Sequence, residues 1–396
     1  MNPPSLLQIV ERLERLAGKL PSRIQKAVLR ELTPLKQLFL QQRPPRFLFT
    51  GLAKIPASEI IGALFGQADS FQADDAAVPF FRWFDVSFPE RGKISVLDAR
   101  GADNSAAIRV HDELKYNPAD IIFFLGADRM SQELEERELA DLNRYLTGNK
   151  ALETGSKIIE IIIPPLEKAV ARDHSDLTVS RQEYALRSNL GRRAAFLETL
   201  RLVPSGPHQT PQLLPPEAQR FMSILARELP NQARMEIIRI SRNREAQHEV
   251  AQLLVKSTTA ICAAIGAQPI PLADLPILTS LQLMMISGIM YVSGRERSLR
   301  ASTEFIGTLG ANVGVAMLLR EGTRALLKFF PGWGNVVCGL VAGSGTYAIG
   351  RAATVFFIDG VSLKDARRTY LASRKKRVRL DLPGAESACK ERCNGK

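Results

Sequence analysis

The sequence predicts an α/β domain followed by an all-α domain. Short apolar runs of strand type begin at Arg46, Lys93, Asp120 and Lys157, and segments with helical periodicity separate them. This alternation is typical of a sheet flanked by helices. From about Arg244 the strand-like runs stop, and long helices rich in Ala, Gly, Met and Ser follow. With 396 residues the chain is long enough for about two to three domains that each bury a core.

The composition is that of a folded protein, because 45% of the residues are hydrophobic and 24% are charged. The net charge of +12 indicates an anionic neighbour, either lipid or nucleic acid. The first residues include acidic side chains and no continuous apolar stretch, so we expect no secretory signal there. The 4 histidines are scattered, and the cysteine pair near the end of the sequence has no further Cys or His beside it, so we expect no metal site of that kind.

Changes in pattern divide the sequence into a helical leader, an α/β domain, a helical domain and a polar tail, over residues 1–43, 44–230, 240–378 and 379–396. The leader carries leucines at helical spacing, so we expect an amphipathic segment that packs on the α/β domain, with a lipid surface as the alternative. Within the α/β domain we expect a basic helix from Arg181 to Leu200. The proline-rich segment 204–216 should be irregular.

The segment from Gly51 to Ser58 lies between a strand and a helix, where a phosphate-binding loop stands in many proteins. A working loop has Gly, four residues, Gly, Lys and then Ser or Thr. Gly51 and Ser58 fit this spacing, but Pro56 and Ala57 stand where the second glycine and the lysine belong. Proline has no N–H to donate to a phosphate and alanine has no charge. Lys54 inside the loop is the one nearby replacement for the missing cation, although an exposed loop lysine is usually just solvated.

The order of these elements resembles the Era-like branch of the P-loop GTPases, from about Pro44 to Leu229. The resemblance implies a mixed sheet flanked by helices. The strand that begins at Lys93 ends in Asp98, Ala, Arg and Gly101, which match the family's Asp-x-x-Gly motif. The resemblance implies that Asp98 and Ser58 would hold Mg²⁺. An ordinary strand end followed by a turn glycine is the alternative.

The other motifs of that family are damaged. Glu167 stands near the position of the acid that binds guanine, but prolines replace the Asn and Lys that precede it, and residues 67–81 hold no threonine for the metal. We therefore predict a pseudo-GTPase with little or no hydrolysis and no cofactor. Its vestigial nucleotide-binding residues would be Gly51, Lys54, Ser58, Asp98, Gly101 and Glu167. The alternative is an atypical but active GTPase that binds GTP, with Mg²⁺ held by Ser58 and Asp98.

The helical domain resembles a bacterial domain of unknown function that follows Era-like GTPase domains. The run from Pro269 to Met285 carries this resemblance, which extends to about Lys376 and implies no chemistry. Leu275 to Gly294 and Phe329 to Gly350 contain no charged residue and have the length of about 20 residues that a membrane span requires. Their polar residues and glycines fit a tightly packed soluble bundle as well, so the sequence leaves open whether this domain is membrane-embedded.

A basic stretch follows the last apolar helix and comprises Arg367, Arg368, Arg374, Lys375, Lys376, Arg377 and Arg379. Each such group near an anionic surface contributes about 1 kcal/mol. We therefore expect membrane lipid as the partner, at the cytoplasmic face of a bacterial inner membrane, with an integral protein as the alternative.

A companion GTPase or another protein is a second candidate partner. Nucleic acid is not expected, because the helical domain has no Gly-x-x-Gly loop and does not interleave basic with aromatic residues. The predicted function is a membrane-associated pseudo-GTPase that regulates or scaffolds. The active GTPase and a soluble helical interaction protein are its alternatives.

Overall fold

The computed structural model describes the chain in segments: residues 11, 14, 15, 18, 22–66, 81–88, 91–127, 131–149, 155–163, 186, 188, 190, 194–205, 210–267, 274–309 and 333–381. The chain divides into two compact units. One unit, called the α/β unit here, comprises Gln42–Asn243. The other, called the helical unit, combines Met1–Gln41 with Arg244–Lys396.

The α/β unit is built on a mixed sheet, as predicted, and this sheet has six strands in the order β2-β3-β1-β4-β5-β6. Its strands are β1 (Arg46–Gly51), β2 (Trp83–Phe88), β3 (Gly92–Asp98), β4 (Ile121–Ala127), β5 (Ser156–Ile163) and β6 (Ala194–Arg201). All neighbours pair in parallel except β2, which runs antiparallel to β3. In the centre of the sheet, Leu48 of β1 lies opposite Leu97 of β3 and Ile122 of β4.

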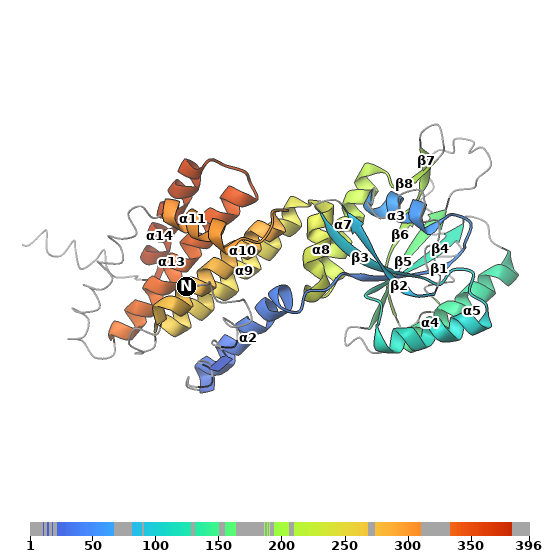
Figure 1. The fold of residues 1–396 in the computed structure, drawn as a ribbon, viewed down its shortest axis with the longest axis horizontal. Helices are drawn as coiled ribbons and strands as arrows, with labels where there is room; N and C mark the ends of the chain where they lie inside the picture. The colour runs from blue at the N-terminus through green and yellow to red at the C-terminus, as the bar shows by residue number, and fades with distance from the viewer. Residues whose placement is uncertain are drawn as a thin grey trace, which may run out of the picture. The chain divides into compact units, whose positions relative to one another are not determined.

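Helices cover both faces of this sheet (Figure 1). One face packs against α3 (Ala57–Phe65), α7 (Pro215–Glu228) and α8 (Asn231–Ser241), and the other against α4 (Asn104–Tyr116) and α5 (Gln132–Gly148). Because both faces are buried, the central strands need apolar residues at nearly every position, and the sequence shows them as continuous apolar runs.

Phenylalanines fill the core beneath α3 and α7. The ring of Phe123 on β4 lies with its centroid 5.1 Å from that of Phe47 on β1 and 5.9 Å from that of Phe221 on α7. Phe65 at the end of α3 lies 5.7 Å from Phe221. These distances are those of favourable aromatic pairs. They join the first strand, its following helix and a helix from the end of the unit.

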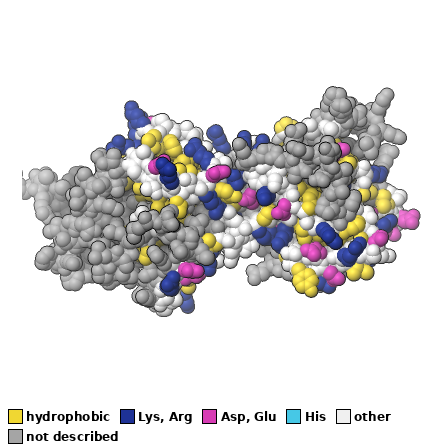
Figure 2. Space-filling model, in the orientation of Figure 1, with side chains coloured by type: hydrophobic (Ala, Val, Ile, Leu, Met, Phe, Trp, Pro, Cys, Tyr) yellow, Lys and Arg dark blue, Asp and Glu magenta, His cyan; other side chains and the backbone are white. Residues whose placement is uncertain are grey.

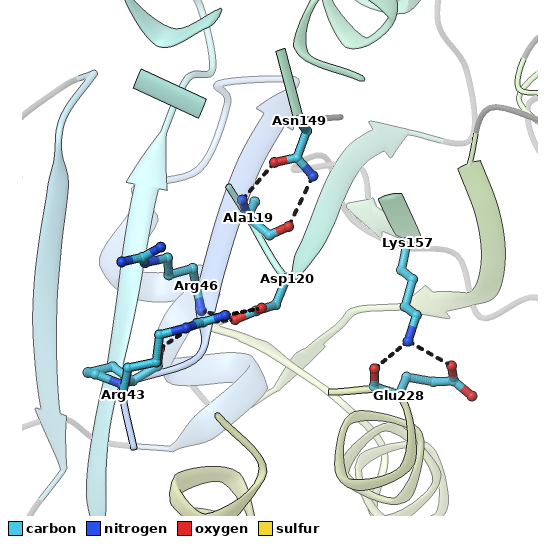
Figure 3. Close-up of polar contacts among 8 residues, drawn as sticks. Arg43, Arg46, Ala119, Asp120, Asn149, Lys157 and Glu228 are labelled. Carbon is cyan, nitrogen blue, oxygen red and sulfur yellow. Dashed lines mark hydrogen bonds and ion pairs between the residues drawn. The ribbon is translucent and has the colours of Figure 1, made fainter. Parts of the chain in front are cut away.

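Polar contacts hold the amino-terminal edge of the sheet together (Figure 3). The guanidinium of Arg43 donates to both carboxylate oxygens of Asp120 at 2.6 Å each, and the backbone N–H of Arg46 donates to the same carboxylate. The amide of Asn149 makes hydrogen bonds to both backbone groups of Ala119, at 2.7 and 3.0 Å. These contacts fix the starts of β1 and β4, so the loops at their carboxyl ends project from a rigid frame.

Two local predictions were wrong in this unit. The stretch predicted as a helix from Arg181 to Leu200 is helical at its described residues Leu186, Ser188 and Leu190, but it ends in the strand β6, which pairs with β5 and buries Leu200. Pairing with a buried neighbour strand outweighs local propensity here. The segment predicted to be irregular contains a short hairpin of β7 (Val203–Ser205) and β8 (Thr210–Gln212), after which α7 begins at Pro215. Proline suits this position because the first turn of a helix needs no N–H donor.

The helical unit contains α2 (Ser22–Phe39), α9 (Arg244–Gly266), α10 (Asp274–Val292), α11 (Leu299–Leu309), α13 (Trp333–Phe357) and α14 (Leu363–Asp381). The second part of this unit begins at Arg244, which is where the strand-like runs end in the sequence. The leader helix α2 belongs to this unit and packs on α9, whereas we expected it on the α/β domain. The Ser257 hydroxyl of α9 donates to Glu31 of α2 at 2.7 Å.

Two of these helices cover most of the apolar runs that have spanning length in the sequence, namely α10 and α13. Among the residues that the structure describes, no helix combines the length and the apolar content that crossing a bilayer requires. The membrane-embedded form of the helical domain stays a prediction. The start of the second run, residues 329–332, lies outside the described residues.

Glycines let α13 approach α9 closely. A Cβ added at Gly343 would lie 3.0 Å from the Cβ of Ala263, and one added at Gly339 would lie 2.8 Å from the carbonyl oxygen of Ala263. At Gly350 an added Cβ would lie 2.5 Å from a methyl group of Val255. These glycines thus allow the close packing of the two helices.

We predict that Gly350→Ala destabilises the helical unit by about 1–3 kcal/mol, because the β-branched Val255 cannot turn its methyl groups away without strain. Gly345→Ala is the matched control, since an added Cβ there meets nothing within 4 Å. That control should stabilise the unit by roughly 0.5–1 kcal/mol. Urea unfolding followed by Trp333 fluorescence in a Trp83→Phe background measures both. Equal effects of the two substitutions would contradict the close packing.

Candidate functional site

A candidate ligand-binding site lies at the carboxyl ends of β1 and β3 in the α/β unit. The strand order puts β1 between β3 and β4, so the chain crosses over β1 when it passes from β3 to β4. Such a point, at which the strand order reverses, is a topological switch point, and in open α/β sheets ligands bind there, outside the carboxyl ends of the strands. The loop after β1 and the turn after β3 both lie at this edge, and both carry residues selected from the sequence.

The loop after β1 begins at Gly51, whose φ of +94° favours glycine. A Cβ at this position would lie 2.3 Å from the carbonyl oxygen of Leu125, so the close approach of β4 also requires glycine. The next N–H, of Leu52, donates to the same Leu125 oxygen at 2.9 Å. The first amide of the loop is therefore directed at the sheet and not at a ligand.

The end of this loop forms the start of α3. Pro56 precedes the helix and supplies no N–H and no side-chain cap. Ala57 is buried, Ser58 is half-buried and Lys54 is exposed. Within the described residues Lys54 makes no ion pair and the Ser58 hydroxyl makes no hydrogen bond. The loop thus presents one exposed lysine, and nothing in the described structure directs that lysine inward.

The turn after β3 brings Asp98 and Gly101 beside the first loop. The N–H of Ala99 donates to the carbonyl of Phe49 on β1 at 2.8 Å. Gly101 has a φ of +68°, and a Cβ added there would lie 3.6 Å from the Cβ of Ala53. Asp103 then caps α4, and hydrogen bonds from the Ala106 N–H and the Ser105 hydroxyl hold the pKa of its carboxyl below the ordinary value.

Arg100 occupies the space between the two loops. Its Nε donates to Oδ1 of Asp98 at 2.7 Å, and its Nη2 donates to Oδ2 of Asp98 at 2.8 Å. Its Nη1 donates to the carbonyl oxygen of Ile55 in the first loop at 2.8 Å. Arg100 and Asp98 are only 5% and 1% exposed. This contact, called the Arg100 clamp here, is a buried bidentate ion pair with a third bond to the loop.

The Arg100 clamp changes what Asp98 can do. Both carboxylate oxygens accept from a guanidinium, and the backbone N–H of Arg100 adds a further bond to Oδ1 at 3.2 Å. A carboxylate satisfied in this way has its negative charge neutralised within the protein. An incoming cation at Asp98 would have to displace the guanidinium.

The structure thus brings four of the sequence-selected residues into two neighbouring loops: Gly51, Lys54, Asp98 and Gly101, with Ser58 on the helix that follows. Glu167 lies outside the described residues. Arg367 and Arg368 are exposed on α14 of the helical unit. Arg374, Lys375, Lys376, Arg377 and Arg379 lie on the same helix, but their side chains are outside the described part of the structure.

Sequence reasoning missed Arg100. The residue stands inside the Asp98-to-Gly101 motif, two positions after the aspartate. An arginine so close to a strand-end carboxylate is a usable signal, because the turn that follows a strand folds back over its end. Nothing in the sequence indicates that the other partner of Arg100 is the carbonyl oxygen of Ile55, because every residue has a backbone carbonyl.

We predict that Arg100→Met lowers the free energy of unfolding of the α/β unit by about 3–5 kcal/mol, because Asp98 would remain buried without a compensating charge. Arg109→Met, on the exposed face of α4, should change it by less than about 0.5 kcal/mol. Urea unfolding followed by Trp83 fluorescence in a Trp333→Phe background measures this unit. The double variant Asp98→Leu/Arg100→Met should recover part of the loss, and no recovery would contradict an ion pair as the cause.

Comparisons with known proteins give limited information about this chain. No protein-family model matches it. Magnetosome membrane protein 22 of Magnetospirillum gryphiswaldense is 28% identical to it over 134 residues, which is 31% of this chain and 66% of that protein. The match therefore covers slightly less than two thirds of the relative, and it is a partial similarity to a membrane protein.

Proposed function

We propose that the protein is a membrane-associated, GTPase-like protein that regulates or scaffolds other proteins and hydrolyses GTP little or not at all. The Arg100 clamp carries this proposal. In the P-loop GTPases that the sequence resembles, the aspartate of the Asp-x-x-Gly motif acts through Mg²⁺. In this chain the guanidinium of Arg100 takes that carboxylate instead, at 2.7 and 2.8 Å.

The clamp supports a domain with a single resting state. A nucleotide switch works because the γ-phosphate and its Mg²⁺ hold loops that are released after hydrolysis. Here the bond from Arg100 to the Ile55 carbonyl ties the two loops together with a group that belongs to the chain. A permanently tied site is better suited to presenting a constant surface than to cycling between two forms.

The composition of the first loop supports the same conclusion. Pro56 and Ala57 remove one amide donor and one cation from the phosphate position. A hydrogen bond to a charged group contributes about 1.5–3 kcal/mol, so the loss of the lysine and of the guanine contacts removes several kcal/mol. A micromolar site, at about −8 kcal/mol, would then bind in the millimolar range or more weakly.

The membrane part of the proposal has separate support. The partial relative is named a membrane protein. The exposed residues Arg367 and Arg368 begin a basic stretch on α14, and such stretches are attracted to anionic lipid. We take the cytoplasmic face of a bacterial inner membrane as the proposed location.

Titration of the full-length protein with a fluorescent GTP analogue tests the first part. We predict no saturable binding below about 1 mM, with or without Mg²⁺, because the loop cation is missing and Asp98 is engaged. An active GTPase in the same buffer serves as the positive control. Saturable micromolar binding that requires Mg²⁺ and is lost in Ser58→Ala or Asp98→Asn would contradict the proposal and favour the GTP-binding alternative.

A further inference from the structure

Helix α14 has a buried side and an outward side. Ala366 and Tyr370 are 0% and 8% exposed and form the buried side. On the outward side Leu371 is 55% exposed, and Lys364 and Arg367 are exposed as well. Arg367 lies four residues before Leu371 and Lys364 lies seven before it, so the three share one helix face. We call Lys364, Arg367 and Leu371 the outer face of α14.

The cations of this face are available for an external partner. Lys364 and Arg367 make no ion pair within the described residues. The nearby acid Asp365 is already engaged, because it accepts from the Ser362 hydroxyl at 2.7 Å and from Arg368 at 3.2 Å. Beyond Leu371 the helix continues to Asp381 with five further basic residues in its sequence. The outer face of α14 therefore presents two cations and an exposed leucine, on a helix whose sequence is basic.

Resting on the membrane part of the proposed function, we propose that the outer face of α14 lies flat on an anionic bilayer surface. Lys364 and Arg367 contact lipid phosphates, and Leu371 inserts at the level of the headgroups. This combination of a basic face and a protruding apolar side chain is typical of helices that lie in the membrane interface. Figure 2 shows hydrophobic and basic side chains intermixed on the described surface of the helical unit.

Charge complementarity alone would also fit nucleic acid, but the apolar and aromatic residues favour lipid. Proteins that bind single strands stack bases on aromatic side chains. The single aromatic residue of α14, Tyr370, is on the buried side. An exposed leucine next to two cations adds nothing to a contact with a phosphate backbone, whereas it gains from burial in a bilayer interface.

Vesicle flotation of the full-length protein tests the proposal. We expect binding to vesicles of phosphatidylcholine with about 30% phosphatidylglycerol, weakened by high salt, and little binding to phosphatidylcholine alone. Lys364→Glu/Arg367→Glu should weaken the apparent partition coefficient at least tenfold. Leu371→Ser should weaken it severalfold without changing its salt dependence. Circular dichroism checks that each variant is folded.

Matched controls come from α4 of the α/β unit, where Ile108 is 57% exposed and Arg109 is exposed. Ile108→Ser and Arg109→Glu should bind vesicles like the parent. If the parent binds phosphatidylglycerol vesicles and the α14 variants bind equally well, the outer face of α14 is not the docking surface, although membrane association stands. If the parent binds no vesicles, or binds a single-stranded oligonucleotide in preference to them, both the inference and the membrane part of the proposed function are overturned. The GTP titration judges the rest of that proposal separately.

Discussion

The guanidinium of Arg100 joins the end of β3, the loop after β1 and the carboxylate of Asp98 in one buried contact, and the arrangement of the candidate site depends on it. Because all three bonds are 2.7–2.8 Å long and the group is almost fully buried, the contact is expensive to open. The two loops can therefore keep their relative position without a bound ligand. We propose that Arg100 here takes the place that a metal and a phosphate have in the P-loop GTPases.

The frame that carries this contact is rigid at its other edge. Asp120 and Asn149 fix the starts of the central strands through hydrogen bonds to Arg43 and to the backbone of Ala119. Phenylalanine packing under α3 then sets the position of the helix that follows the first loop. These contacts are consistent with the proposed constant surface of this unit.

The helical unit is held together by close contacts between its helices. Its central contact depends on the absence of side chains, because Gly343 and Gly350 let α13 approach Ala263 and Val255 of α9. Small residues at helix contacts are common both in membranes and in tight soluble bundles, so the sequence pattern alone had two interpretations. The structure adds that Lys364, Arg367 and Leu371 are exposed on one side of α14, which is the surface that we propose for membrane binding.

Much of the fold could be predicted from the sequence. The strands at Arg46 and Lys157 and the domain change at Arg244 were found, because a doubly covered sheet demands continuous apolar runs and long helices demand a different period. The strand β6 and the place of α2 were missed. The strand β6 forms by pairing with β5, and α2 is placed by packing on α9. Both partners are distant in the sequence, and the local secondary-structure propensity of a segment carries no information about them.

The candidate site, too, could be predicted from the sequence only in part. The sequence by itself determined that Pro56 offers a phosphate no N–H donor, that Ala57 offers it no charge and that Asp98 ends a strand, because these are properties of residue type and local pattern. Only the tertiary structure decided which group neutralises Asp98. That depends on the turn at Gly101, which directs Arg100 back over the strand, and on the Ile55 carbonyl, 45 residues earlier in the chain, which the parallel pairing of β1 and β3 brings to the same edge.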